Sequence, residues 1–260
     1  MRLKAFRTVL SAVTILLWFD TACTAHQEAR QAVPVADSRA ETEASGALEK
    51  LGVPLQRDSR GAVRWIEAVG GEMSDEAMQY LSSLKELEWL EIGGGKVTSL
   101  GTRHLKNCKS LKRLYIYDVD LTDDNLKWLS NLTRLEALSL QRTGISGQAL
   151  NSLKPLDKLV ILNLSGNNIS DEDMDQIARI EELEVLALGN TKITGNGIAK
   201  LEGMARLNEL NVMNCDLMDS DLEFFMTMPN LRIVYAEGCS ISDMAVFRIV
   251  TQYPMLAIFR

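Results

Sequence analysis

The chain has 260 residues, of which 46% are apolar, and a formal net charge of −7 at pH 7. The acidic balance argues against a nucleic-acid partner, because phosphate backbones select surfaces with clustered Lys and Arg. The four cysteines show no C-x-x-C spacing, and no histidine stands at metal-ligand spacing from them, so we expect no metal site.

The first 25 residues have the order of a secretory signal. Arg2, Lys4 and Arg7 precede an apolar run over residues 8–19, and mostly small residues follow as far as Ala25. The run of 12 residues is shorter than the ~20 residues of a membrane-spanning helix. We therefore expect an exported protein of the cell envelope, either lipid-anchored or soluble in the periplasm or outside the cell.

The end of this signal segment admits more than one interpretation. Residues 21–23, Thr-Ala-Cys, resemble the end of a bacterial lipobox, and this resemblance implies a lipid anchor on Cys23. The lipobox has an aliphatic residue where Asp20 stands in this chain. Ordinary cleavage after Ala25 is the main alternative, and an uncleaved anchor is another.

Two short segments precede the main part of the chain. Residues 26–45 are polar and lack periodicity, so we expect a disordered tether. Residues 46–62 are expected to form an N-terminal cap, with a short helix that ends at Gly52 and the first strand of a hairpin around a turn at residues 58–61. Such a cap would cover a strand edge that could otherwise pair with another chain.

A motif of the form L-x-x-L-x-L recurs from there on at a constant step of 24 residues. Its first leucine stands at Leu87, Leu111, Leu135, Leu159, Leu183, Leu207 and Leu231. A weaker copy begins at Val63, and a terminal half-repeat begins at Met255. A constant period in this range indicates a stack of identical structural units rather than one globular core.

Each repeat, numbered from this first residue as position 0, divides into a strand and a helical segment. Positions 0, 3, 5, 10, 15, 18 and 21 are apolar in all eight repeats except at Thr102 and Gln252. Positions 3 and 5 have strand spacing, whereas positions 15 and 18 have helical spacing. Position 11 is Ser or Thr in seven repeats, as an N-cap requires. An aspartate follows at position 12 in five repeats, where it would complement the helix dipole. Acidic pairs at positions 12 and 13 recur every 48 residues through six repeats.

The motif and the linker Thr-Lys-Ile-Thr at residues 191–194 resemble the leucine-rich repeat, in its bacterial class with 24-residue repeats. The resemblance implies an α/β solenoid: a right-handed horseshoe with a parallel β-sheet on its concave face and short helices on its convex face. It covers residues 63–260 as eight repeats and a terminal half-repeat. It also implies binding of a protein partner rather than catalysis.

Position 8 is where this family usually places Asn, which bonds the backbone of adjacent turns. Here Cys215 and Cys239 occupy it in neighbouring repeats. Their expected Cα separation of about 5 Å is within disulfide reach. The alternative is a pair of free thiols that point inward and bond the backbone.

Positions 2, 4 and 6 point away from the core, so their side chains are free to serve function. The first three strands gather residue types that are enriched in interface hot spots, with two carboxylates beside them. The candidate partner-binding residues are Trp65, Glu67, Trp89, Glu91, Arg113, Tyr115 and Tyr117. In the alternative interpretation the two tryptophans pack against the N-terminal cap. Because this face has no histidine or nucleophile, we expect no catalytic residues and no cofactor.

The sequence therefore predicts an exported, non-enzymatic scaffold that holds a protein partner on its concave face. One alternative is a structural or surface spacer that self-associates through its terminal strand, residues 255–260. Another is an intracellular adaptor that recruits substrates, which would need a helical recruitment domain. Residues 24–62 are too short and too polar to form one.

Overall fold

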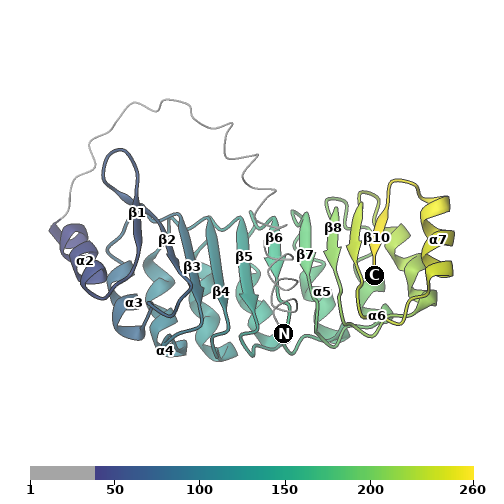
Figure 1. The fold of residues 1–260 in the computed structure, drawn as a ribbon, viewed down its shortest axis with the longest axis horizontal. Coiled ribbons are helices and arrows are strands. Elements are labelled where there is room, and N and C mark those ends of the chain that lie inside the picture. The colour runs from purple at the N-terminus through teal and green to yellow at the C-terminus, as the bar shows by residue number, and fades with distance from the viewer. Residues whose placement is uncertain (1–38) are drawn as a thin grey trace. The chain divides into compact units, whose positions relative to one another are not determined.

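The computed structural model describes residues 39–260, which form a regular array of strands and short helical segments (Figure 1). The expected signal segment, with Cys23 and its lipidation, and residues 26–38 of the expected tether lie outside the described residues. Within residues 39–260, no helix is both long enough and apolar enough to cross a bilayer.

The strands form one sheet whose spatial order is the order of the chain. The strands are β1 (Leu55–Arg57), β2 (Val63–Ala68), β3 (Trp89–Gly93), β4 (Arg113–Tyr117), β5 (Ala137–Gln141), β6 (Ile161–Asn163), β7 (Val185–Ala187), β8 (Glu209–Asn211), β9 (Ile233–Tyr235) and β10 (Ala257–Phe259). β1 and β2 pair antiparallel, and every later pair is parallel at a shift of 24 residues.

The helical segments that connect these strands are short and include both α-helix and 3-10 helix. They are α2 (Arg39–Lys50), α3 (Asp75–Leu81), α4 (Ser99–Thr102), η1 (Arg103–Asn107), η2 (Asp123–Asn131), η3 (Gly147–Leu153), η4 (Asp171–Asp173), α5 (Met174–Ile177), α6 (Gly195–Ala199), η5 (Asp219–Thr227) and α7 (Asp243–Gln252). The predicted side-chain cap is formed in five of the eight repeats: for example, Ser74 accepts from the amide of Ala77, and Thr194 accepts from the amide of Asn196.

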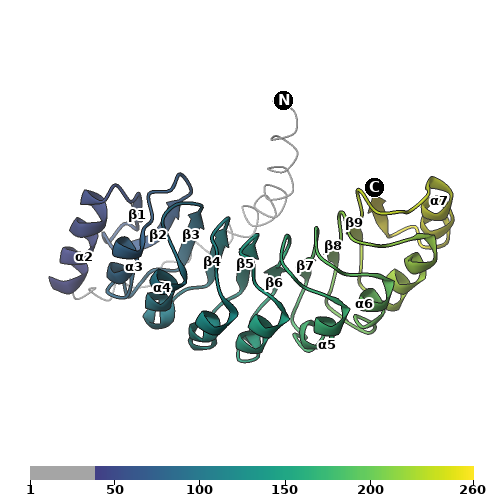
Figure 2. The same ribbon diagram turned by 90° about the horizontal axis from the view of Figure 1, so that it is seen from below.

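The array is curved, with the strands on its concave side and the helical segments on its convex side (Figure 2). Stacked strands are about 4.8 Å apart, whereas a helix with its side chains is about 10 Å wide. The helical side is therefore the longer one, and the sheet bends inward. The predicted α/β solenoid with a parallel concave sheet is confirmed.

The core lies between these two layers and consists of the predicted apolar positions. Leu90, Leu114 and Leu138, which share position 3, are fully buried, as are their equivalents in later repeats. Thr102 is also fully buried, and its hydroxyl donates to the carbonyl oxygen of Ser99 at 3.3 Å. A polar side chain is tolerated at this core position because its hydrogen bond is formed locally.

The side chains at position 8 bond backbone groups of their own and adjacent turns. The Asn167 amide donates to the carbonyl oxygen of Leu164 at 2.8 Å and also to that of Leu140, one repeat earlier. Cys215 and Cys239 are free thiols, which contact the carbonyl oxygens of Leu188 and Val212 at 3.2 and 3.1 Å. Burial raises the pKa of both thiols. Of the two alternatives for this pair, the structure has the inward-pointing thiols.

The aspartates at position 12 serve the following repeat in addition to opening their own helical turn. Asp75 accepts from the backbone amide of Thr98 at 2.8 Å and from its hydroxyl at 2.6 Å. The same pair of bonds joins Asp123 to Ser146, Asp171 to Thr194 and Asp219 to Ser242. These carboxylates therefore link neighbouring repeats through their capping residues.

The 48-residue alternation follows from this link. Three of the four repeats whose capping residue bonds the aspartate of the previous repeat carry a small residue at position 12, namely Ser99, Gly147 and Gly195, whereas the last one carries Asp243. In the next repeats, Asp173 and Asp221 at position 14 accept from the amides of their own capping residues at 2.9 Å. A Cβ on either glycine would overlap the neighbouring carboxylate. Small and acidic residues thus alternate because one carboxylate fills each space.

The N-terminal cap differs from the prediction in one respect. Helix α2 begins at Arg39, so the expected tether is wrong for residues 39–45. Ala44, Ser45 and Leu48 are buried on its inner face. The segment lacks large apolar residues, but its Ala and Glu residues favour a helix, and packing against the array buries the small side chains.

Candidate functional site

The seven predicted partner-binding residues lie together on β2, β3 and β4, and we call them the N-terminal aromatic patch. Trp65, Trp89 and Arg113 are register partners on successive strands. One step along these strands, Glu67, Glu91 and Tyr115 form a second such row, and Tyr117 ends β4. The 24-residue step of the sequence places these side chains side by side on one face of the sheet.

The larger side chains of the patch contact one another. The rings of Trp89 and Tyr115 have centroids 5.7 Å apart at an interplanar angle of 53°. The guanidinium carbon of Arg113 lies 5.2 Å from the centroid of the Trp89 ring, within the range of a cation–π interaction. The hydroxyl of Tyr117 donates to the carboxylate of Glu91 at 3.2 Å. The members of the patch on β3 and β4 are thus held in one arrangement by their own contacts.

Part of the patch is accessible to solvent. Trp65 is 38% exposed, and Glu67 is exposed beside it. The remaining members are partly buried by one another. Gln56 of β1 is the register partner of Trp65, so Trp65 lies beside the cap strand and is still partly exposed. Packing of the tryptophans against the cap therefore stays an alternative prediction. That these residues bind a partner stays a prediction.

A hollow of about 260 Å³ opens within the patch. It is lined by Gln56, Trp65, Ile66, Glu67 and Trp89. The hollow combines apolar ring surface with one carboxylate, so its electrostatic character is acidic. Its volume suits one side chain of a partner rather than a larger ligand, because drug-sized sites occupy about 300–1,000 Å³.

Burial changes the titration of the patch. Burial raises the pKa of Glu91, and the nearby charge of Glu67 raises it further, whereas the hydrogen bond from Tyr117 acts in the opposite direction. Burial also raises the pKa of Tyr115 to about 12 and raises the pKa of Tyr117. Both phenols therefore stay protonated at neutral pH and can donate hydrogen bonds.

The rest of the concave face offers less to a partner. The equivalent positions of the central strands carry no aromatic or charged residue, and the small residues Ala137, Ser139 and Ala187 are buried there. At the far end, the rings of Tyr235 and Phe259 stack with centroids 5.3 Å apart. Aromatic and charged groups are thus concentrated at the N-terminal end of the sheet, as the sequence indicates.

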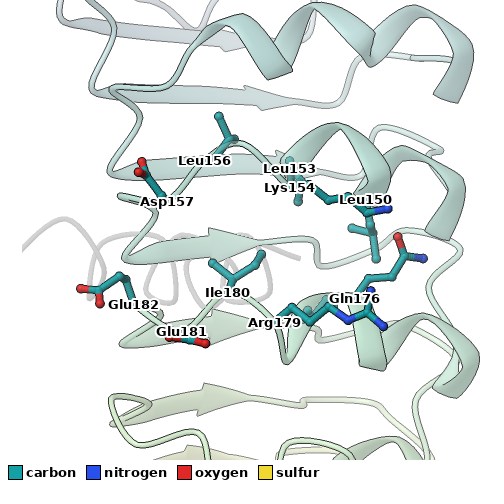
Figure 3. Close-up of a pocket in the computed structure, with 11 residues that line it drawn as sticks. Leu150, Leu153, Lys154, Leu156, Asp157, Gln176, Arg179, Ile180, Glu181 and Glu182 are labelled. Carbon is teal, nitrogen blue, oxygen red and sulfur yellow. The ribbon is translucent and has the colours of Figure 1, made fainter.

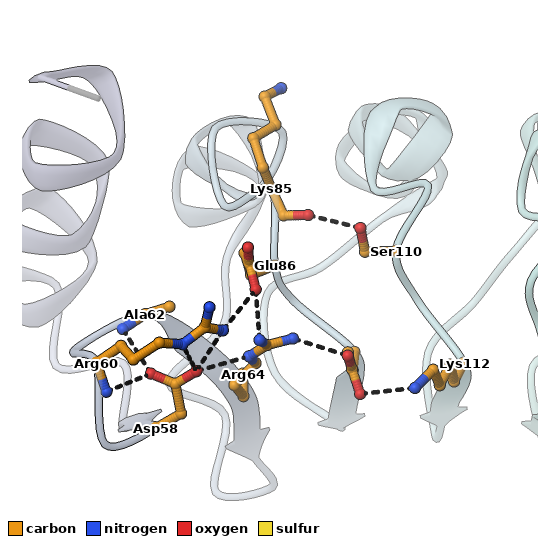
Figure 4. A network of polar contacts seen from close by, with 9 residues as sticks. Asp58, Arg60, Ala62, Arg64, Lys85, Glu86, Ser110 and Lys112 are labelled. Atoms are coloured by element: carbon orange, nitrogen blue, oxygen red, sulfur yellow. Dashed lines mark hydrogen bonds and ion pairs between the residues drawn. The ribbon is translucent and has the colours of Figure 1, made fainter. Parts of the chain in front are cut away.

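A network of ion pairs runs along the starts of the strands that carry the patch (Figure 4). Arg64 contacts Asp58, Glu86 and Glu88 at 3.1, 2.5 and 2.7 Å. Glu88 also contacts Lys112 at 3.0 Å. Residues 64, 88 and 112 are one repeat apart, so their pairs join β2, β3 and β4. Every charged side chain of this network has an ion-pair partner, which indicates that the network has a structural role.

Asp58 is the anchor of this network in the hairpin turn. Its burial raises its pKa, but hydrogen bonds from the amide and side chain of Arg60, from Arg64 and from the amide of Ala62 lower it to about 2. The carboxylate therefore stays ionised at all ordinary pH values. The network holds the hairpin and the first three parallel strands in register.

A second pocket lies on the convex side between η3 and α5 (Figure 3). It has a volume of about 390 Å³ and mixes apolar with oppositely charged side chains. Its lining residues include Leu153, Ile180, Lys154, Asp157, Arg179 and Glu182. The side-chain oxygen of Gln176 is buried there without a hydrogen-bond partner. We find no nucleophile beside a general base in this lining, and no group of metal-ligating side chains occurs within residues 39–260.

Comparisons with known proteins agree with this architecture. The family model described as Leucine Rich Repeat matches residues 158–180. The crystal structure of internalin C2 from Listeria monocytogenes is similar at 21% identity, with a TM-score of 0.59, over 88% of this chain and 93% of that one. A leucine-rich repeat protein of Leptospira interrogans is similar at 23% identity, with a TM-score of 0.51. The match spans 70% of this chain and about half, 51%, of the Leptospira protein. No curated protein matches the sequence.

The chain has a leucine-rich repeat fold, and residues 158–180 match the family model itself. Its repeats are 24 residues long, and both similar structures are bacterial, which is consistent with the bacterial class that the motif resembles. At these identities the similarity establishes the fold, whereas the function must be argued from the patch.

Proposed function

We propose that this protein is a non-enzymatic scaffold that holds a protein partner on its concave face, with the N-terminal aromatic patch as the main contact. The observation that carries this proposal is that two tryptophans, two tyrosines and an arginine share one partly exposed face on three adjacent strands, where Trp89 contacts both Tyr115 and Arg113. Trp, Tyr and Arg dominate the binding energy of protein interfaces.

The rigidity of the patch supports this proposal. Arg113 and Tyr115 contact Trp89, Tyr117 donates to Glu91, and the ion-pair network joins the three strands beneath them. A preorganised surface loses little side-chain entropy when it binds, so more of the contact energy appears as affinity. Leucine-rich repeats as a class serve as protein-interaction scaffolds, and the patch fits that use.

Substitution of both tryptophans tests the proposal. In Trp65→Ala/Trp89→Ala we expect at least a ~10-fold loss of affinity for the partner identified by cross-linking to the wild-type protein, because hot-spot side chains contribute ~2 kcal/mol or more each. The matched control Glu209→Ala/Asn211→Ala alters the same face on β8 and should bind normally. Circular dichroism should show that both variants fold. Undiminished capture by the tryptophan variant, or collapse of its folded state, would contradict the proposal.

We also propose that the scaffold is exported. The support is the order of charged, apolar and small residues over positions 1–25. Mass spectrometry of the mature protein distinguishes the alternatives: a diacylglyceryl group on Cys23 indicates a lipoprotein, and an N-terminus at His26 indicates a soluble one. A full-length pool in the cytosol would contradict export.

A second candidate function, self-association as a structural spacer, has its own observation. β10 is the last strand in the described sheet and pairs with β9 along one edge. Beside it, Met244, Phe247 and Met255 are 76%, 65% and 72% exposed. An open strand edge beside exposed apolar side chains favours pairing with a second copy of the chain.

A further inference from the structure

The hollow in the N-terminal aromatic patch is lined by two tryptophans, Trp65 and Trp89. Trp65 and Trp89 are register partners on adjacent strands, about 4.8 Å apart at the backbone. Among residues 39–260, the ring contacts join Trp89 to Tyr115 and Tyr235 to Phe259, but none joins the two tryptophans. Indole surface therefore lines the hollow instead of being covered by a neighbouring ring.

Trp89 already contacts a cation, the guanidinium of Arg113. Arg113 comes from β4, on the side away from Trp65, and its guanidinium carbon lies 5.2 Å from the Trp89 ring centroid. The quadrupole of an indole attracts a cation to either face of the ring. The structure thus contains, within one repeat of the hollow, an example of the contact that a second cation would make.

The carboxylates beside the hollow favour a positive charge. Glu67 lines it, and Glu91 is the register partner of Glu67 on β3. Like charges directly opposite each other on a sheet are destabilising. Glu86 and Glu88 pair with Arg64, whereas no ion pair of the described part of the chain involves Glu67 or Glu91. A cation between them would offset their repulsion.

We propose that the hollow between Trp65 and Trp89 binds a basic side chain of the partner, arginine in preference to lysine, with Glu67 and Glu91 as its counter-charges. This inference rests on the proposed function and specifies the partner as a protein with an exposed basic segment. Arginine is preferred because its planar guanidinium can lie flat on an indole ring and still donate to carboxylates at its edge. The carboxylates of the hollow would repel an acidic segment of a partner.

Short peptides added to the full chain test this specificity. The probes are three peptides of alternating glycine and a second residue, which is arginine, lysine or glutamine. In ¹H–¹⁵N spectra we expect the arginine peptide to shift the indole N–H signals of Trp65 and Trp89 and to leave that of buried Trp128 in place. The lysine peptide should bind more weakly, and the glutamine peptide should produce no shift.

Charge removal completes the test. Glu67→Gln should lower the affinity for the arginine peptide about 5-fold or more, which is the range expected for one cation–carboxylate contact beside an indole. Glu209→Gln removes the same charge from the same face on β8 and should leave the affinity unchanged. Equal losses in both variants would indicate general charge attraction and would overturn the inference, as would binding of the glutamine peptide at equal strength.

These outcomes are separable from the fate of the proposed function. If the tryptophan double variant loses its protein partner while Glu67→Gln keeps both partner and peptide affinity, the scaffold function stands and the cation site is wrong. If the arginine peptide binds as expected but the partner is still captured by the tryptophan variant, the hollow binds cations and the partner docks elsewhere, which overturns the inference for that partner.

Discussion

Backbone conformation at single residues decides how each strand leaves the sheet. Position 7 has a positive φ in seven consecutive repeats, from Gly94 to Gly238. Asn190 and Asn214 suit this left-handed region, and the amide of Asn214 donates to the side-chain oxygen of Asn190 at 3.0 Å. Arg142 does not suit it, and two hydrogen bonds from Arg142 to Asp118 at 2.6 and 2.7 Å hold it there. The non-glycine residues at this position are thus supported by contacts with a neighbouring repeat.

Glycine is needed most strictly at position 8 of the second repeat. Gly95 has a φ of +89°, and a Cβ there would lie 2.9 Å from the Cα of Gly71. We expect Gly95→Ala to lower the free energy of unfolding by about 2–4 kcal/mol, since strain and a backbone clash add. Gly94→Ala is the matched control, because Gly94 has a positive φ but open space around it, and should cost only about 1 kcal/mol. Urea unfolding measures both, and equal losses would contradict the clash.

Glu91 gives the patch a pH-dependent contribution to stability. Its pKa in the folded protein is raised above the ordinary 4.5, so over the window just above pH 4.5 the folded state binds more protons than the unfolded state. Stability should therefore fall as pH rises through this window. We expect Glu91→Gln to reduce the dependence of the melting temperature on pH between pH 4 and 7. The control Glu76→Gln, on the exposed helical side, should keep the wild-type dependence on pH. An unchanged slope in Glu91→Gln would contradict this assignment.

At the scale of whole elements, the two ends of the array are built differently. The N-terminal end is covered by α2 and the β1–β2 hairpin, and the ion-pair network secures that hairpin. At the other end, α7 has apolar side chains on its outer face, and β10 has an unpaired edge within the described sheet. This asymmetry is the basis of the self-association hypothesis.

Lysine substitutions on α7 test that hypothesis without disturbing the core. Met244 and Phe247 are mostly exposed, so Met244→Lys/Phe247→Lys should keep the wild-type melting temperature. If a second copy covers this end, sedimentation should show a concentration-dependent dimer for the wild type and a monomer for the variant. Leu100→Lys, which changes an exposed leucine on α4, should leave the dimer intact. A wild-type protein that is monomeric at all concentrations would contradict self-association.

At the scale of the whole molecule, stability comes from the contacts between neighbouring repeats, since no single repeat buries enough surface to fold alone. The carboxylate links also constrain the order of the repeats. A repeat with an aspartate at position 12 must precede a repeat whose capping residue can donate hydrogen bonds to that aspartate. Asp171 bonds Thr194 in the next repeat, whose Gly197 leaves room for that carboxylate. The structural unit of the array is therefore a pair of repeats.

Deletions of equal length test this pairing. Removal of residues 135–182 takes out one contiguous pair and brings Asp123 beside Thr194, a normal junction. Removal of residues 135–158 and 183–206 deletes the same number of residues but directs two carboxylates at each of two capping residues. We expect the first variant to be more stable by about 1–3 kcal/mol, because the second leaves carboxylates without donors. Urea midpoints that do not differ would contradict the pairing rule.

The sequence by itself determined the repeat, its core and the patch. Because the motif recurs at a constant step, it specifies which side chains face inward and which share a row, so residues as distant as Trp65 and Arg113 could be assigned to one face. These features depend only on the two-residue period of a strand and on the length of the repeat.

Only the tertiary structure decided the features that depend on contact between repeats. These are the start of α2 at Arg39, the carboxylate links, the free state of Cys215 and Cys239, and the hollow beside Trp65. Each is set by the space and the hydrogen-bond partners that a neighbouring turn supplies across 23 to 27 residues of sequence. Local propensity and periodicity do not contain this information, because the free energy of each contact exists only when the two turns are stacked.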